Sequence, residues 1–169
     1  MKEGFPECWV MFLCFFYICT QAGLFPASQE KFHLLTHNSI KMNVPANCKY
    51  SEDHEWIRIE SGNIAYVGIT DYAQGELGEL VYIEVETVGE TIGAGEVFGT
   101  VEAVKTTSDL FMPVKAKVLE FNDKVSDSGD PSLVNSDAYG DGWLVKVEIA
   151  DLAELNNLMD AKQYEAHIS

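Results

Sequence analysis

The sequence predicts a mostly β domain, a small barrel or sandwich covered by short helices. Three observations lead to this prediction. Short stretches of alternating hydrophobicity recur from Tyr50 onward, Gly and Asn/Asp turn signals separate them, and the hydrophobic period changes to that of a helix near the C-terminus. Many short strands followed by one terminal helix are typical of antiparallel β structure rather than of an α/β fold.

The first predicted elements are a hairpin, a short helix and a strand. Two strand-like stretches flank the turn signal Ser61-Gly62-Asn63. Thr70-Asp71 can cap a helical turn, which we expect to end at Gly78. Residues 81–86 then alternate in hydrophobicity, so one strand with one wet face is expected there. Its predicted core-facing residues are Val81, Ile83 and Val85.

A second hairpin is predicted in the middle of the chain. The stretches 97–104 and 110–118 are rich in apolar residues, and pairing them leaves Lys105 at an exposed tip among small polar residues. A lysine on a rigid turn suits covalent acylation, because its amine is accessible and its long side chain can become a mobile tether. Taken alone, a lysine at such a position is most often a solvated loop residue.

The C-terminal part is expected to contain one more strand and the terminal helix. Residues 145–149 alternate between apolar and charged side chains. Residues 152–159 have leucines at helical spacing, with Asp151 as the expected cap and Glu154 three residues later.

Residues 1–41 are not expected to belong to this domain. Their apolar run from Cys8 to Thr20 is too short to cross a membrane, since a spanning helix needs about 20 apolar residues. The region also lacks the basic start of a signal peptide and the arginines of a transit peptide. We interpret residues 1–41 as an extraneous or poorly ordered extension, such as an over-long start, and residues 42–169 as the functional domain.

The charge of the chain excludes several classes of partner. The net charge is −16, and all of it lies in residues 42–169, because three lysines and three glutamates cancel in residues 1–41. Such a surface repels phosphate backbones and anionic lipid, so binding to nucleic acid or to a membrane is not expected. No His/Cys cluster has the spacing of a metal site and no Ser-His-Asp pattern is recognisable. Neither a metal site nor a catalytic activity is therefore predicted.

The segment around Lys105 resembles the lipoyl and biotinyl attachment pattern. Val104 and Thr106 flank the lysine where biotin carriers usually have methionines, which favours lipoate. The other matching positions are Gly89, Ile92, Gly95, Glu102 and Pro113-Val114.

The wider chain resembles the H-proteins of the glycine cleavage system. The tip sequence Val-Glu-Ala-Val-Lys-Thr-Thr-Ser-Asp is similar to that of this family, and four further motifs follow its order over about residues 46–165. These motifs are Tyr50-x-x-x-His54-Glu55-Trp56, Val67-Gly-Ile-Thr-Asp-Tyr-Ala-Gln74, Leu77-Gly78-Glu79 and Tyr139-Gly-Asp-Gly-Trp143. The resemblance implies a lipoyl-domain-like barrel-sandwich hybrid with (R)-lipoate covalently bound to Lys105.

The resemblance also implies a carrier without catalysis of its own. The glycine decarboxylase (P-protein) would load the aminomethyl group of glycine onto the lipoyl arm, and the aminomethyltransferase (T-protein) would pass the one-carbon unit on. Dihydrolipoamide dehydrogenase (L-protein) would reoxidise the dithiol, and a lipoate ligase or lipoyl/octanoyl transferase would attach the cofactor. A bacterial member would be cytoplasmic, and a eukaryotic one would lie in the mitochondrial matrix.

The family shelters the loaded arm in a surface cleft, which suppresses its hydrolysis. By match of position, Glu55, Asp109 and Asp53 are the candidates to hold the ammonium group of the arm, because carboxylates in a half-sheltered groove stabilise a cation. Individually, each is more often an ordinary surface charge. Many family members have His at the edge of this cleft, where this chain has Tyr72.

Two other functions stay open from the sequence. The chain could relay lipoyl or octanoyl groups from Lys105 to other lipoyl domains, a role that the sequence does not separate from that of a carrier. It could also be a binding module that kept the fold and lost the arm, although the complete motif around Lys105 argues against this.

Overall fold

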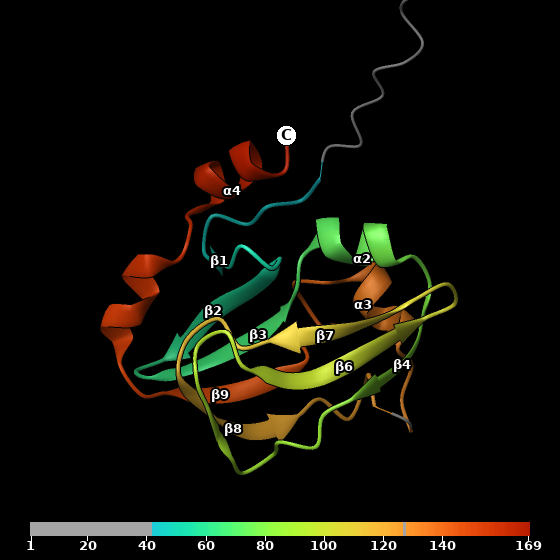
Figure 1. Cartoon of the computed structure of the whole chain (residues 1–169), viewed down its shortest axis with the longest axis horizontal. Helices are drawn as coiled ribbons and strands as arrows, with labels where there is room; N and C mark the ends of the chain where they lie inside the picture. Colours follow the sequence, from blue (N-terminus) through green and yellow to red (C-terminus); the bar gives the residue numbers. More distant parts are fainter. Residues whose placement is uncertain (1–41, 127) are drawn as a thin grey trace, which may run out of the picture. The chain divides into compact units, whose positions relative to one another are not determined.

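Two antiparallel sheets form the framework of the protein in a computed structural model, which describes residues 42–126 and 128–169 (Figure 1). The larger sheet has the strand order β1-β2-β3-β9-β8-β5, and the smaller one the order β4-β6-β7. The extension predicted for residues 1–41 lies outside the described residues. The strands are β1 (Lys49–Tyr50), β2 (Glu55–Ser61), β3 (Ile64–Ile69), β4 (Leu80–Glu84), β5 (Thr91–Ile92), β6 (Val97–Ala103), β7 (Thr107–Phe111), β8 (Ala116–Phe121) and β9 (Val145–Ile149).

Short helices connect and cover the strands. α2 begins after Thr70, whose side chain accepts a hydrogen bond from the Ala73 amide, and ends at Gly78, whose φ of 83° suits glycine. Both ends agree with the prediction. The described helices are α2 (Asp71–Leu77), α3 (Ser132–Ser136), the 3-10 helix η2 (Leu152–Asn157) and α4 (Ala161–His167).

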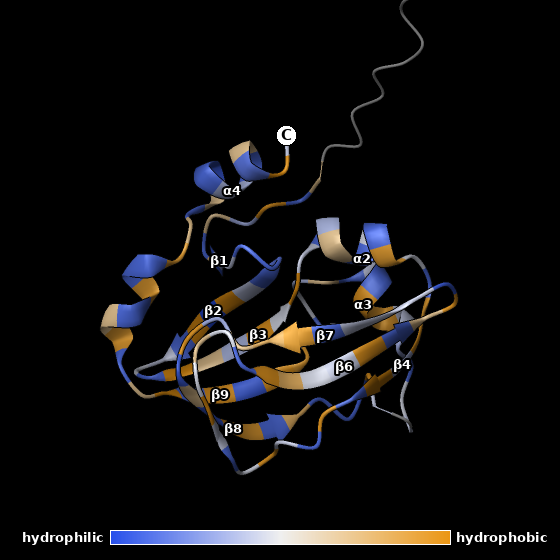
Figure 2. Ribbon diagram, viewed as in Figure 1, coloured by the Kyte–Doolittle hydropathy of each residue, from blue (hydrophilic) through white to orange (hydrophobic). Residues whose placement is uncertain are grey.

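The main hydrophobic core includes side chains from both sheets, such as Val67 of β3, Val101 of β6 and Val147 of β9. Along the strands, hydrophobic and hydrophilic residues alternate, as Figure 2 shows for β8 and β9. A second, aromatic cluster includes Tyr50, Trp56 and Tyr164, and the rings of Tyr50 and Tyr164 stack at 4.6 Å. This stacking holds α4 against β1. The predicted class, mostly β with short helices and a C-terminal helix, is confirmed.

Two details of the predicted strands are wrong. The stretch 110–118 is not one strand, because β7 ends at Phe111 and β8 begins in the other sheet. Pro113 lies in the break, and its missing N–H cannot continue a ladder. Val81 was expected in the core but is 50% exposed. The β4–β6 register shifts between Leu80 and Tyr82, so Val81 falls out of the alternation.

The predicted helix over residues 152–159 is also corrected. Asp151 caps it as expected, since its side chain accepts a hydrogen bond from the Ala153 amide, but the helix is of the 3-10 type. The C-terminal α-helix begins only after Asp160, where a capping box with Gln163 satisfies the first free amides. Local capping thus divides the C-terminal region into two short helices.

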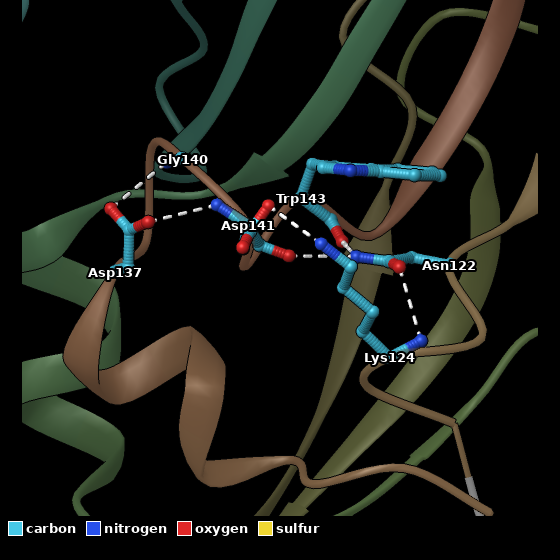
Figure 3. Close-up of polar contacts among 6 residues, drawn as sticks. All are labelled: Asn122, Lys124, Asp137, Gly140, Asp141 and Trp143. Carbon is cyan, nitrogen blue, oxygen red and sulfur yellow. Dashed lines mark hydrogen bonds and ion pairs between the residues drawn. The ribbon is translucent and has the colours of Figure 1, made fainter.

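The Tyr139-Gly-Asp-Gly-Trp143 motif has a structural role in the loop before β9 (Figure 3). The Asn122 Nδ2 atom donates to the carbonyls of Asp141 and Trp143 at 2.8 and 2.7 Å. The Asp137 carboxylate accepts from the amides of Gly140 and Asp141. A Cβ atom at position 140 would overlap the Asp137 carboxylate, so a side chain there would displace this carboxylate from its hydrogen bonds.

Candidate functional site

Lys105 lies in the connection between β6 and β7, next to Val104, which is 65% exposed. Val104, Lys105 and Thr106 connect the strands, and the Ala103 amide donates to the Thr106 carbonyl at 2.8 Å, which closes a turn with Val104 and Lys105 as its two central residues. The tip is therefore tighter than predicted, because Thr107 already belongs to β7. The Val104 amide donates to the Glu79 carbonyl at 3.1 Å, which ties the tip to the start of β4.

Asn135 of α3 fixes the segment to which the tip is tied. Its Nδ2 atom donates to the Gly78 carbonyl at 2.8 Å, and its Oδ1 atom accepts from the Leu80 amide at 3.1 Å. Glu79 therefore lies between two residues that bind the same side chain. The sequence analysis missed Asn135, because nothing in its local sequence indicates a contact with residues about 55 positions earlier.

A cavity of about 290 Å³ lies between β7 and α2, and we call it the β7 groove. The predicted carboxylates Asp53, Glu55 and Asp109 all line it, whereas Lys105 is not among its lining residues. Its lining residues are Asp53, His54, Glu55, Ile69, Tyr72, Ala73, Glu76, Leu77, Val101, Ser108, Asp109 and Leu110. The buried members Ile69, Val101 and Leu110 give the groove an apolar floor.

Glu55 is the one buried carboxylate of the groove, with 2% of its surface exposed. The Phe111 amide donates to its Oε1 atom at 3.0 Å, and the Ser51 hydroxyl donates to its Oε2 atom. Burial raises the pKa of Glu55 to about 7, and the hydrogen bonds from Ser51 and Phe111 oppose this rise. A cation that enters the groove would favour the ionised form of this carboxyl.

Asp109 and Asp53 bring two further carboxylates to the groove, and both are exposed. Asp109 belongs to β7, and Asp53 immediately precedes His54 in the turn before β2. With the exposed Glu76 of α2, one buried and three exposed carboxylates thus line one cavity with an apolar floor. Such a lining suits a ligand that has an apolar chain and a cationic end.

His54 also lines the groove, and its backbone has a left-handed conformation, with φ of 73°. Its Nδ1 atom lies 2.9 Å from the Tyr164 hydroxyl, which in turn lies 2.7 Å from the Thr70 hydroxyl. Burial, and then the nearby His167, lower the pKa of His54, so its imidazole stays neutral near pH 7. The ring of Tyr72 packs on the His54 imidazole, with the two ring centroids 4.7 Å apart. These contacts give His54 a structural role beside the groove.

Comparison with known proteins decides the family. A family model described as "Glycine cleavage H-protein" matches residues 48–169. The glycine cleavage system H protein of Bacteroides fragilis is 55% identical over 128 residues, which cover 76% of this chain and 99% of that protein. The chain belongs to the glycine cleavage H-protein family. The H protein of Brevibacillus brevis is 52% identical over 127 residues, which cover 75% of this chain and 98% of that protein.

A solved structure supports the same assignment. The crystal structure of a glycine cleavage system H protein from Mycobacterium marinum matches with a TM-score of 0.65 and 39% identity, and covers 73% of this chain and 97% of that one. The predicted family, and with it the predicted role as a non-catalytic lipoyl carrier of the glycine cleavage system, is confirmed.

Two further findings concern the described residues only. No helix within residues 42–126 and 128–169 is long and apolar enough to cross a membrane. In the same part of the chain, no group of three or more His, Cys, Asp or Glu residues is arranged to hold a metal ion.

Proposed function

We propose that the chain carries its lipoyl group on Lys105 and shelters the loaded end of the arm in the β7 groove. The observation that carries this proposal is the position of the two-residue tip at the start of β7, one wall of a groove lined by carboxylates. Asp109 follows Lys105 by four residues, about 13 Å along an extended strand. An extended lysine side chain with a lipoyl chain spans a similar length, about 12–15 Å by ordinary bond lengths.

Each part of the site has a distinct task in this proposal. The tight turn presents the Lys105 amine to the enzyme that attaches the cofactor. When bound, lipoate supplies a disulfide that takes up and releases the aminomethyl group of glycine. Glu55, Asp109 and Asp53 hold the ammonium end of the loaded arm by charge, and the apolar floor of the groove keeps water away from it.

The proposed partners are those of the glycine cleavage system. The P-protein, T-protein and L-protein take the arm in turn, and a lipoate ligase or a lipoyl/octanoyl transferase modifies Lys105. The strongly acidic composition supports this, because an acidic surface favours encounters with basic patches on partner proteins. A cytoplasmic location in a bacterium is part of the same proposal.

Intact mass tests the attachment site. The purified protein, after incubation with a lipoate–protein ligase, lipoate and ATP, should gain the mass of one lipoyl group, and peptide mapping should place it on Lys105. Lys105→Arg should gain nothing, and the control Lys115→Arg should behave as wild type. An adduct on another lysine, or no adduct on a folded chain, would refute the proposal. The mass of native protein would also report where the chain starts.

A further inference from the structure

The edge of β7 that faces away from β6 is open. Within the smaller sheet, β7 pairs with β6 on one side only. The residues whose backbone groups face β6 follow from the hydrogen bonds at both ends of the strand: the Thr106 carbonyl accepts from Ala103, and the Met112 amide donates to Glu96. In an antiparallel ladder these groups alternate, so Thr106, Ser108, Leu110 and Met112 face β6.

The alternate residues Thr107, Asp109 and Phe111 therefore direct their backbone groups away from β6. The bond from the Phe111 amide to the Glu55 carboxylate confirms this direction and shows that the open edge faces the β7 groove. Within the described part of the chain, the backbone N–H groups of Thr107 and Asp109 have no hydrogen-bond acceptor comparable to the Glu55 carboxylate. Open strand edges of this kind can bind an extended chain through its amide groups.

The acylated side chain of Lys105 would carry one such amide group. An extended lysine side chain reaches about 6 Å from its Cα atom, by ordinary bond lengths. Thr107 follows Lys105 by two residues, about 7 Å along the strand. If the arm runs along β7 from Lys105, its amide thus lies level with Thr107 and its far end lies level with Asp109.

Building on the proposed lipoylation of Lys105, we propose that the open edge of β7 is a docking site for the amide of the acylated lysine. The Thr107 backbone N–H donates to the amide carbonyl of the arm, which then lies along β7 as an added strand would. The carboxylates hold the other end of the loaded arm, so it is fixed at two points.

This contact makes docking depend on acylation. The unmodified lysine ammonium has three donors and no acceptor, so it cannot accept from the Thr107 N–H. Acylation replaces the ammonium with an amide, whose carbonyl is an acceptor. The same carbonyl is present in octanoyl-lysine and lipoyl-lysine. The edge therefore distinguishes acylated from free lysine, and the carboxylates distinguish a loaded arm from an empty one.

Amide hydrogen exchange tests the contact directly. The rate for Thr107 would be measured by NMR in the unmodified full-length chain and in the chain that is lipoylated and loaded from glycine by the decarboxylase. We expect exchange at Thr107 to slow by about tenfold on loading, since a hydrogen-bonded amide must open before it exchanges. The Ser108 amide, which faces β6, serves as the internal control and should not change. An unchanged Thr107 rate in a chain that carries the adduct on Lys105 would overturn the docking site.

Two substitutions at one position give a second test. Thr107→Pro removes the outward N–H but no hydrogen bond to β6, which an edge strand tolerates, and Thr107→Val keeps the N–H. Mass spectrometry would follow the loss of the aminomethyl adduct to water. We expect loss at least threefold faster in Thr107→Pro than in Thr107→Val, and equal rates would contradict the docking site. Absence of any adduct on Lys105 would instead refute the proposed attachment site, so the two failures are distinguishable.

Discussion

The two ends of strand β7 differ in exposure and in hydrogen bonding; we call the tip with Lys105 the open end, and the end beside Glu55 in the β7 groove the closed end. At the open end, Lys105 lies in a two-residue turn beside the exposed Val104, held by one hydrogen bond across the turn and one to Glu79. At the closed end, Glu55 is 2% exposed and receives hydrogen bonds from Ser51 and Phe111. A carrier needs both, because its lysine must reach the enzymes that modify and load it, while the loaded group must be kept from water. The fold provides both along one strand.

The largest predicted effect concerns the closed end and depends on pH. Because burial raises the pKa of Glu55 from its ordinary 4.5 to about 7, the folded state binds this proton more tightly than the unfolded state. The stability from this proton is present below about pH 4.5 and is lost as the pH rises through 7. The glutamine of Glu55→Gln does not ionise, so this variant does not lose that stability as the pH rises. From pH 4.5 to pH 8, urea unfolding should show the variant gaining on the order of 3 kcal/mol relative to wild type.

The variant Asp109→Asn provides the matched control for this prediction. Asp109 is exposed, so its replacement should change the free energy of unfolding by less than about 0.5 kcal/mol. A Glu55→Gln profile parallel to wild type between pH 4.5 and 8 would show that Glu55 is not buried as described.

The next largest effect concerns the support of the open end. Asn135→Ala removes hydrogen bonds to Gly78 and Leu80 and should lower the free energy of unfolding by about 2 kcal/mol. It should also loosen Glu79 and the tip. We therefore expect kcat/KM of a lipoate ligase for this variant to fall severalfold at a temperature where it remains folded.

Ser136→Ala is the control on the same helix. Ser136 is exposed, and its hydroxyl donates only to the Leu133 carbonyl at 3.2 Å. Its loss should change neither measurement appreciably. If Asn135→Ala lost stability but was lipoylated at the wild-type rate, the support of the tip by Asn135 would be disproved.

The smallest effect is predicted at the tip itself. Val104→Ala should change the free energy of unfolding by less than about 0.5 kcal/mol, since Val104 is 65% exposed. Val101, three residues earlier on β6, is 1% exposed in the floor of the groove. Val101→Ala should cost about 2 kcal/mol through lost burial and the cavity left behind. Equal losses from the two substitutions in urea unfolding would contradict the contrast between the tip and the floor.

The open end of β7 could be predicted from the sequence largely because its signals are local. Turn residues, strand periodicity and the attachment pattern all lie within about 25 residues around Lys105. The helix from Thr70 to Gly78 was predicted correctly for the same reason, since both caps are neighbours of the helix they end.

The closed end could be predicted only in part, because its properties come from distant contacts. Position in the motif indicated Glu55 as a candidate, but its burial depends on Ser51 and on Phe111, which lies 56 positions away. Asn135 gave no signal at all. The exposure of Val81 follows from a bulge opposite β6, and such irregularities leave no mark in a simple alternation of hydrophobicity.

The Phe111 amide is the most direct probe of the whole account, because it donates to the Glu55 carboxylate at the closed end of β7. Its 1H–15N NMR signal would be compared before and after the lipoylated chain is loaded with the aminomethyl group of glycine. The account predicts that the Phe111 signal shifts on loading, while that of Lys105→Arg treated in the same way does not. A loaded arm on Lys105 that leaves the Phe111 signal unmoved would show that the arm does not rest in the β7 groove.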